Sequence, residues 1–331
     1  MLKNGPLVTV VVVPRERFSL TKLCLERLYA VTPAPFALVY VDGGSPRRIK
    51  RYLEDQAKQR GFLLVRTDRY LSPNEARNLG LRYVNSKYVV FIDNDVLVSP
   101  GWLEALVRCA EETEAWLVGP LYCFGTPEFT IVHMAGGTAN IEQREGRRNL
   151  VERHHLPGKR LAAVRADLHR TPCELVEFHC ILARTDVFER IGPIDEGFPS
   201  DFEHIDLCLS VREAGGAIYL EPSALVNWVT PPPLAWSDLP YFMLRWSDAW
   251  NRASLRHFRE KWQMTEDDPN RHYAFVTQYR RRALRPLWTL IRRTIGWRLG
   301  TWLERRVLFP MEETLNRFFS MRASRNGLAG N

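Results

Sequence analysis

The first half of the chain alternates between buried-strand patterns and helical ones. Val8–Val13 is a β-branched run without polar alternation, as in a strand covered on both faces. Shorter apolar runs at 36–41, 62–65 and 88–92 predict three further strands, and leucines at helical spacing follow Ser19. Strands separated by helices predict βαβ units. We therefore expect an α/β fold with an open, mostly parallel sheet and helices on both sides.

Three Ser-Pro pairs mark the expected helix starts in this half. Ser45-Pro46, Ser72-Pro73 and Ser99-Pro100 each place a capping serine before a proline at the first helical position. Glu75 completes a capping box with Ser72, and Gly61 is expected to end the second helix. These signals predict three crossovers between strands.

Polar clusters follow three of the predicted strands. They are Pro14–Arg17, Asp42–Ser45 and Asp93–Asp95. In an open α/β sheet ligands bind at the carboxyl ends of the strands, so the three clusters should converge on one site.

The chemistry of these clusters suits a diphosphate-containing ligand. Asp93 and Asp95 can hold one Mg²⁺ or Mn²⁺ ion, which bridges and neutralises two phosphates. Asp42, followed by two glycines, can accept a hydrogen bond from a base or ribose. Each motif alone is also typical of a turn, so their joint spacing carries the hypothesis.

A helix face offers a further ligand group. Asn74, Arg77 and Asn78 lie three and four residues apart and therefore share one face of the predicted helix. Arg77 could reach a phosphate or a sugar hydroxyl. The alternative is a surface salt bridge.

Composition limits the class of protein. The 331 residues are 45% hydrophobic and include no low-complexity tract, which indicates a globular protein. The net charge of +8 comes largely from arginines after residue 279. The six cysteines lie far apart and indicate thiols in a reducing compartment. The N-terminal apolar run is about a third of the roughly 20 residues of a membrane span, so we expect a cytoplasmic protein without signal peptide or transmembrane helix.

The remaining segments have weaker patterns. Residues 120–175 show little periodicity and are expected to form long loops over the acceptor side, with His154-His155 in a solvated turn. An aromatic run follows Pro231–Pro233, and either packs on the core or forms a sugar-stacking rim. Its members are Trp236, Tyr241, Phe242, Trp246 and Trp250.

The pattern of the tail from Gln278 onward predicts a basic amphipathic helix. Its apolar residues recur at three- and four-residue steps and arginines flank them. The apolar stripe consists of Leu284, Leu287, Trp288, Ile291, Ile295, Leu299 and Trp302. Such a helix suits an anionic membrane surface, and the alternative is a helix docked on its own domain or on a partner chain.

Over residues 7 to 230 the sequence resembles the family-2 glycosyltransferases with the GT-A fold. Seven ordered segments carry the resemblance. They are the strand ending in Pro14, Val41–Ser45, Ala76–Gly80, Phe91–Asp95, Cys180–Arg184, Phe188–Glu196 and Glu203–Leu209. The resemblance implies a nucleotide-diphospho-sugar transferase with a GT-A core and a helical C-terminal extension, and a UDP-sugar is the favoured donor.

The resemblance also implies roles for single residues. Asp42 would hold the base of the nucleotide, Asp93 the ribose or the metal, and Asp95 the metal. The expected donor-binding set is Pro14, Glu16, Asp42, Gly44, Arg77, Asn78, Asp93 and Asn94. Glu177 and His179 are expected on the acceptor side, and the catalytic candidates are Glu203, His204 and Asp206.

Two positions depart from the family pattern. The family usually has Glu-Asp-x-Asp where this chain has Glu203-His204-Ile205-Asp206, which leaves the base open among the three polar residues. We favour Glu203 as the base, because a carboxylate at a helix N-terminus stays ionised; the alternative is a capping box formed with Ser200. Asn227 lies where a metal-binding His is common, so His179 or His204 is expected to substitute.

The sequence thus predicts a catalytic domain at 1–230, an aromatic helical extension at 231–277 and a basic tail at 278–331. Within the catalytic domain, 1–120 would bind the nucleotide-sugar and 121–230 the acceptor. We expect an inverting, metal-dependent glycosyltransferase acting on a glycan or lipid-linked acceptor in polysaccharide synthesis, peripheral at the inner membrane face. A catalytically inactive nucleotide-sugar-binding protein is the alternative, and no nucleic-acid partner is expected.

Overall fold

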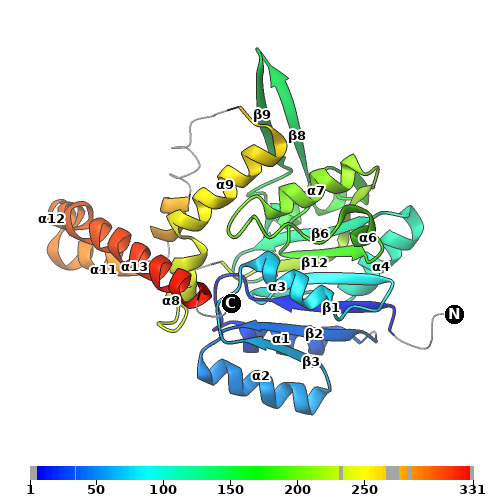
Figure 1. Ribbon diagram of the computed structural model, residues 1–331, viewed down its shortest axis with the longest axis horizontal. Coiled ribbons are helices and arrows are strands. Elements are labelled where there is room, and N and C mark those ends of the chain that lie inside the picture. Colours follow the sequence, from blue (N-terminus) through cyan, green and yellow to red (C-terminus); the bar gives the residue numbers. More distant parts are fainter. Residues whose placement is uncertain (1–5, 34, 231–233, 266–275, 282–284, 329–331) are drawn as a thin grey trace.

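A mixed sheet forms the centre of the molecule (Figure 1). The computed structural model describes residues 6–33, 35–230, 234–265, 276–281 and 285–328. Within these ranges ten strands lie in the order β10-β12-β6-β11-β4-β1-β2-β3, with β5 on β12 and β7 on β6. They are β1 Val8–Val13, β2 Ala37–Gly43, β3 Leu63–Thr67, β4 Tyr88–Asp93, β5 Val96–Val98, β6 Leu117–Phe124, β7 Ile131–Met134, β10 Thr171–Cys173, β11 Cys180–Arg184 and β12 Ile218–Trp228.

Helices flank the sheet, and a two-stranded hairpin projects from it (Figure 1). The hairpin consists of β8 Gly137–Arg144 and β9 Arg147–His154. The helices are α1 Thr21–Val31, α2 Arg47–Arg60, α3 Pro73–Leu81, α4 Trp102–Thr113, α5 Leu161–Val164, α6 Val187–Ile191, α7 Glu203–Glu213, α8 Leu239–Arg245, α9 Asp248–Trp262, α11 Arg285–Ile295, α12 Trp297–Leu303 and α13 Phe309–Leu328.

The first four strands confirm the predicted parallel sheet. β1 pairs in parallel with β2 and β4, and β2 pairs in parallel with β3. All six residues of β1 are buried, as the unbroken apolar run predicted. β11 then runs antiparallel to β4 and β6. The carboxyl ends of β1, β2, β3 and β4 therefore meet at one edge, where the polar clusters lie.

Helix α3 packs unusually close to this sheet. A Cβ atom at Gly80 would lie 2.3 Å from Val11 Cγ1 and 3.2 Å from Val41 Cγ2, so the close approach requires glycine. The helix thereby holds Arg77 beside the end of β4.

One of the three predicted Ser-Pro caps is confirmed. The Ser72 hydroxyl accepts from Glu75 N, and Ser72 N donates to the Glu75 carboxylate at 2.7 Å, forming the predicted capping box. The other two predictions were wrong. Pro46 itself is the N-cap of α2, while Ser45 bonds to Asp42 instead. Helix α4 starts at Trp102, after a left-handed Gly101 without any side-chain cap.

We expect Ser72→Ala to lower the free energy of unfolding by about 1 kcal/mol, because it removes the acceptor for the Glu75 amide. Urea unfolding followed by circular dichroism measures this change. Ser72→Asn keeps a capping oxygen and should lose less. Equal stability of the alanine and wild-type proteins would contradict a stabilising cap.

The prediction of long loops over 120–175 was wrong. This region contains β6, β7, the β8–β9 hairpin and β10. The sequence signal for a strand was weak here, because the side chains of β9 are exposed or half-buried on both faces. They do not alternate between buried apolar and exposed polar positions. The hairpin therefore looks polar and irregular in sequence.

The C-terminal extension packs on the catalytic part through α8. Asn316 of α13 donates to Met243 O at 2.8 Å and accepts from Asp248 N. The predicted single amphipathic helix was wrong, since Gly296, at φ 82°, separates α11 from α12. Of the predicted apolar stripe, Leu284 lies outside the described residues. Among the described helices none is both long and apolar enough to cross a bilayer.

Candidate active site

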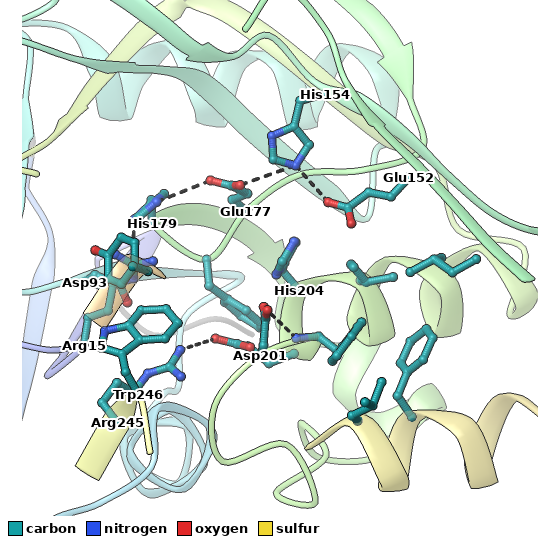
Figure 2. Close-up of a pocket in the computed structure, with 18 of the residues that line it drawn as sticks. Arg15, Asp93, Glu152, His154, Glu177, His179, Asp201, His204, Arg245 and Trp246 are labelled. Atoms are coloured by element: carbon teal, nitrogen blue, oxygen red, sulfur yellow. Dashed lines mark hydrogen bonds and ion pairs between the residues drawn. The ribbon is translucent and has the colours of Figure 1, made fainter. Parts of the chain in front are cut away.

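A cavity of about 920 Å³ opens beside the ends of β1 and β4. This volume falls in the range of roughly 300–1,000 Å³ that is typical of small-molecule sites. Its walls come from the β1–α1 loop, the end of β4, the β8–β9 hairpin, the start of α7 and the C-terminal extension (Figure 2). Six of the predicted site residues line it: Arg77, Asp93, Glu177, His179, Glu203 and His204.

Asp93, Asp95 and His179 form a candidate metal-binding cluster. Asp93 and His179 line the cavity, whereas Asp95 is fully buried and does not line it. One ligand atom from each lies within 4.8 Å of the other two. Both carboxylate oxygens of Asp95 and Nδ1 of His179 are buried without a hydrogen-bond partner among the described residues. Buried polar atoms are rarely left so, and a cation bound by two carboxylates and an imidazole would satisfy them. The residues therefore fit a divalent ion.

Two arginines of the β1–α1 loop also face these acids. Arg15 Nε lies 3.3 Å from Asp93 Oδ2, and Arg17 Nη2 lies 3.6 Å from Asp95 Oδ2. Burial raises the pKa of Asp95 to about 7, although both arginines oppose this. Burial, together with the charge of Arg15, lowers the pKa of His179 to about 4. His179 is therefore neutral at neutral pH, the form that binds metals.

Arg77 orients Asp93 from helix α3. Its guanidinium donates to Asp93 Oδ1 at 3.0 Å and to Asn74 Oδ1 at 2.9 Å, and it lies 3.7 Å above the Phe178 ring. Arg77 is only 1% exposed, so the alternative of a surface salt bridge was wrong. It lines the cavity, and its guanidinium is already paired with Asp93.

Two predicted donor-binding asparagines have packing roles in the structure. Asn78 donates to Ile194 O and Glu196 Oε1 and accepts from Ile194 N, which ties α3 to the 194–196 segment. Asn94 donates to Arg17 O and accepts from Arg15 N, which fixes the β1–α1 loop. Neither side chain lines the cavity. Asn94 thus positions the loop that contains Arg15 and Arg17, and Asn78 holds α3 against the 194–196 segment.

The predicted nucleotide-binding turn lies outside the cavity. Asp42 is 1% exposed and accepts hydrogen bonds from Ser45 N and Oγ, and it also pairs with Arg66. Gly44 has φ 73°, and a Cβ there would lie 3.0 Å from Arg69 O. The turn is thus rigid, with its carboxylate already bound. Asp42 and Gly44 are not among the residues that line the cavity.

Helix α8 covers the loops that were expected to bind the donor. Tyr241 donates to Pro14 O at 3.2 Å and Leu71 O at 3.0 Å, and its ring packs between Phe18 and Tyr70. Asp238, just before α8, accepts from the backbone N–H of Phe18 and Ser19. The aromatic extension therefore packs directly on the carboxyl ends of the strands.

The extension also reaches Glu16. This carboxylate is fully buried and accepts from Trp246 Nε1 at 2.8 Å and from the Tyr279 hydroxyl at 3.0 Å. Trp246 and Tyr279 in turn line the cavity. Glu16 thus links the β1–α1 loop to the extension, where the sequence had predicted contact with the donor.

The three catalytic candidates have different surroundings. Glu203 Oε1 accepts from Arg245 at 2.9 Å, and Glu203 Oε2 is buried without a hydrogen-bond partner in the described part of the chain. His204 Nε2 is equally unpartnered. Asp206 instead pairs with Lys261 and accepts from Trp262 Nε1, both on α9, and it does not line the cavity. Of the three catalytic candidates, Asp206 is thus the one that contacts α9 and lies outside the cavity lining.

The alternative role of Glu203 in a capping box was also wrong. The N-cap of α7 is Phe202, at φ 70°, and no side chain caps the helix. Ser200 donates instead to Arg245 O at 2.8 Å. Glu203 is the first residue of α7, so its carboxylate still lies at the positive end of the helix.

A histidine cluster surrounds Glu177 on the acceptor side. His133 Nε2 lies 3.0 Å from Glu177 Oε2, and the Nε2 atoms of His179 and His154 lie 3.4 and 3.7 Å from the same carboxylate. Burial alone would raise the pKa of Glu177, but the three imidazoles hold it well below its usual range. Figure 2 shows His204 between His154 and Asp201, facing the same space. His154, at the end of β9, thus faces the cavity instead of the expected solvated turn, whereas His155 is exposed in the bend that follows.

Sequence reasoning missed several residues of the cavity wall. His133 and Glu152 come from a region without a clear pattern, and Arg245 and Tyr279 come from segments that seemed to lie beyond the catalytic part. The ring of Trp228, at the position next to Asn227, stacks on His179 at 5.0 Å. The aromatic run after Pro233 was the available signal. The buried side chains of Tyr241, Phe242 and Trp246 confirm its packing interpretation, and Trp246 also lines the cavity.

The chain is similar to known glycosyltransferases in sequence. Residues 9–171 match the family model described as Glycosyl transferase family 2. The pre-mycofactocin glycosyltransferase of Mycobacterium tuberculosis is 30% identical over 154 residues, which are 46% of this chain and 29% of that protein. The O-antigen biosynthesis protein RfbC of Myxococcus xanthus is 25% identical over 65% of this chain and 16% of its own length. The chain thus spans less than a third of each of these relatives.

Solved structures show the same fold. GalNAc-T7, crystallised with UDP, GalNAc and Mn²⁺, has a TM-score of 0.53 and 14% identity over 83% of this chain and 56% of that one. Residues 1–349 of S. aureus TarS, in complex with UDP-GlcNAc, give a TM-score of 0.50 and 12% identity over 96% of this chain and 81% of that one. At this level of identity the likeness concerns the fold alone, and it confirms the predicted GT-A architecture.

Proposed function

We propose that this protein transfers a sugar from a nucleotide-diphosphate donor to a hydroxyl acceptor, because residues 9–171 match the family model described as Glycosyl transferase family 2. A UDP-sugar is the favoured donor, in keeping with the UDP and UDP-GlcNAc bound by the two proteins of similar fold. The observation that carries the proposal is the cluster of Asp93, Asp95 and His179 at one end of the cavity. His204, whose Nε2 has no hydrogen-bond partner among the described residues, and Glu203, which pairs with Arg245, line the same cavity.

Asp93, Asp95 and His179 would hold a divalent ion, Mn²⁺ or Mg²⁺. Such an ion supplies positive charge that stabilises the leaving diphosphate. The chain itself contributes Arg77, which fixes the orientation of Asp93 through the 3.0 Å hydrogen bond. Arg15 adds a second positive group beside Asp93. The polar end of the cavity is thus suited to the diphosphate and the transferred sugar.

The acceptor hydroxyl would lose its proton to a base on α7. The sequence favoured Glu203, but one oxygen of that carboxylate is already paired with Arg245. His204 has an unpartnered Nε2 facing the cavity, so we assign it as the base and Glu203 as the competing candidate. One base opposite the leaving group is the arrangement for a single displacement with inversion.

Release of UDP from candidate UDP-sugars, with and without Mn²⁺, tests this function. Donor-dependent UDP release that stops in excess chelator supports the transferase. Tight donor binding without any turnover would favour the inactive nucleotide-sugar-binding protein.

We also propose a membrane-facing surface on the C-terminal extension, which would place the protein at the inner face of the membrane. The surface comprises exposed apolar residues of α11 and α12, with arginines such as Arg293 and Arg298 among them. Exposed tryptophans and arginines together suit an anionic bilayer. The apolar members are Leu290, Ile295, Trp297, Leu299 and Trp302, which are 41% to 68% exposed.

The double variant Trp297→Glu, Trp302→Glu should bind anionic liposomes at least about tenfold more weakly, because it removes two inserting rings and adds negative charge. Co-sedimentation measures this. Trp236→Glu is the control, since Trp236 is 89% exposed outside the surface and should not contribute. Unchanged binding by the double variant, or loss in the control, would place the contact elsewhere.

A further inference from the structure

The cavity has an apolar end as well as the polar one that contains Asp93. This apolar limb extends from the start of α7 between the β8–β9 hairpin and α9. Its apolar lining residues are Leu150, Phe202, Ile205, Leu255, Phe258 and Met264, and the polar Arg259 and Thr265 of the same segment also line the cavity. The rings of Phe202 and Phe258 stack at 4.8 Å and form one continuous apolar wall.

The walls of the limb are held together by hydrogen bonds. Arg148 N donates to Thr265 Oγ1 at 2.8 Å, and Thr265 N donates back to Arg148 O at 3.0 Å. These bonds join the hairpin to the segment that follows α9, so the two sides of the limb are fixed relative to each other. The limb is therefore a formed part of the cavity and not a gap between independent elements.

The limb begins beside the proposed base. His204 lies between Phe202 and Ile205 in sequence, and one of its ring nitrogens lies within 4.8 Å of ligand atoms of Glu152 and His154. Glu152 and His154 are on β9, the strand that also supplies Leu150. A molecule whose hydroxyl meets His204 would therefore extend its remaining part into the limb.

We propose that the apolar limb binds an aliphatic chain of the acceptor, of the acyl, alkyl or prenyl type. This inference rests on the proposed function and names the class of acceptor. A sugar in the limb would lose its hydration against apolar side chains, which costs free energy unless each polar group finds a partner. An aliphatic chain gains free energy from the same burial. The exposed apolar residues of α11 and α12 favour an amphiphile at a membrane over a peptide.

Isothermal titration of the full chain with alkyl β-glucosides of increasing length, below their micelle concentrations, tests the inference. We expect affinity to rise about fourfold for each methylene buried, until the limb is full. Leu255→Glu and, independently, Met264→Glu should remove this gain, because each places a charge in the limb. Thermal melting confirms that each variant is folded.

Leu290→Glu is the matched control, since Leu290 is 60% exposed on the membrane-facing surface. It should keep the dependence on chain length. An affinity independent of chain length, or a gain lost in Leu290→Glu but retained in both limb variants, would overturn the inference. UDP release measured alongside separates the two proposals: its absence with a normal chain-length gain would overturn the transferase and leave the limb assignment in place.

Discussion

Replacing Asp95 by alanine should lower sugar transfer by about a thousandfold or more and abolish Mn²⁺ binding measured by calorimetry. The change removes a charged ligand from a cation that stabilises the leaving diphosphate, an effect worth several kcal/mol. The fold should survive, because neither Asp95 carboxylate oxygen accepts a hydrogen bond from the described residues. In this variant Arg17 would still face a carboxylate, because Glu16 Oε1 lies 3.7 Å from Arg17 Nε.

Glu26→Ala is the control for this experiment, since Glu26 lies exposed on α1 and pairs only weakly with Lys22 at 3.8 Å. It should leave both transfer and Mn²⁺ binding unchanged. Full transfer by Asp95→Ala in excess chelator would contradict the metal proposal. The positive charge facing the diphosphate would then come from Arg15 and Arg17 of the β1–α1 loop.

The parallel part of the fold could be predicted because its signals are local. Val8–Val13 is apolar at every position, and a strand buried on both faces needs no other information. The capping box at Ser72 likewise depends on residues three apart. The hairpin was missed because its strands are stabilised by pairing with each other and bury little apolar surface.

The site was only partly predictable because its chemistry depends on long-range contacts. The sequence identified Asp93 and Asp95, and it left His179 and His204 as alternatives for the third ligand. The structure separates these two, since His179 shares a cluster with both aspartates and His204 clusters with α7 and β9 residues. No local pattern could have indicated this.

The contacts of Glu16 and Tyr241 could not be predicted from the sequence either. Glu16 follows a strand end and looked like a donor ligand, but Trp246 and Tyr279, more than two hundred residues later, occupy its carboxylate. Tyr241 looked like one of several packing aromatics, and it packs on the loop of Pro14. A spacing rule reports which groups share an edge of the sheet, but not which distant segment covers them.

The ion pair of Glu203 with Arg245 decides how the two base candidates are ranked. The Arg245 guanidinium lies 2.9 Å from Glu203 Oε1, so one oxygen of that carboxylate already has a partner. His204 has no such ion pair among the described contacts, and its unpartnered Nε2 faces the cavity. We therefore propose that Glu203 is a positioning residue, which holds Arg245 at the cavity wall.

We therefore expect His204→Ala to slow transfer by about a hundred- to ten-thousandfold, the usual effect of removing a general base, with Mn²⁺ and donor affinity unchanged. Steady-state UDP release with acceptor, together with calorimetry of donor binding, measures both. His204→Asp restores the acidic residue that the family usually has at this position and should recover most of the activity. Glu203→Gln keeps a hydrogen-bond acceptor for Arg245, so it should cost much less than His204→Ala. If Glu203→Gln is inactive while His204→Ala stays near the wild-type rate, Glu203 is the base, because a merely positioning carboxylate would be largely replaced by its amide.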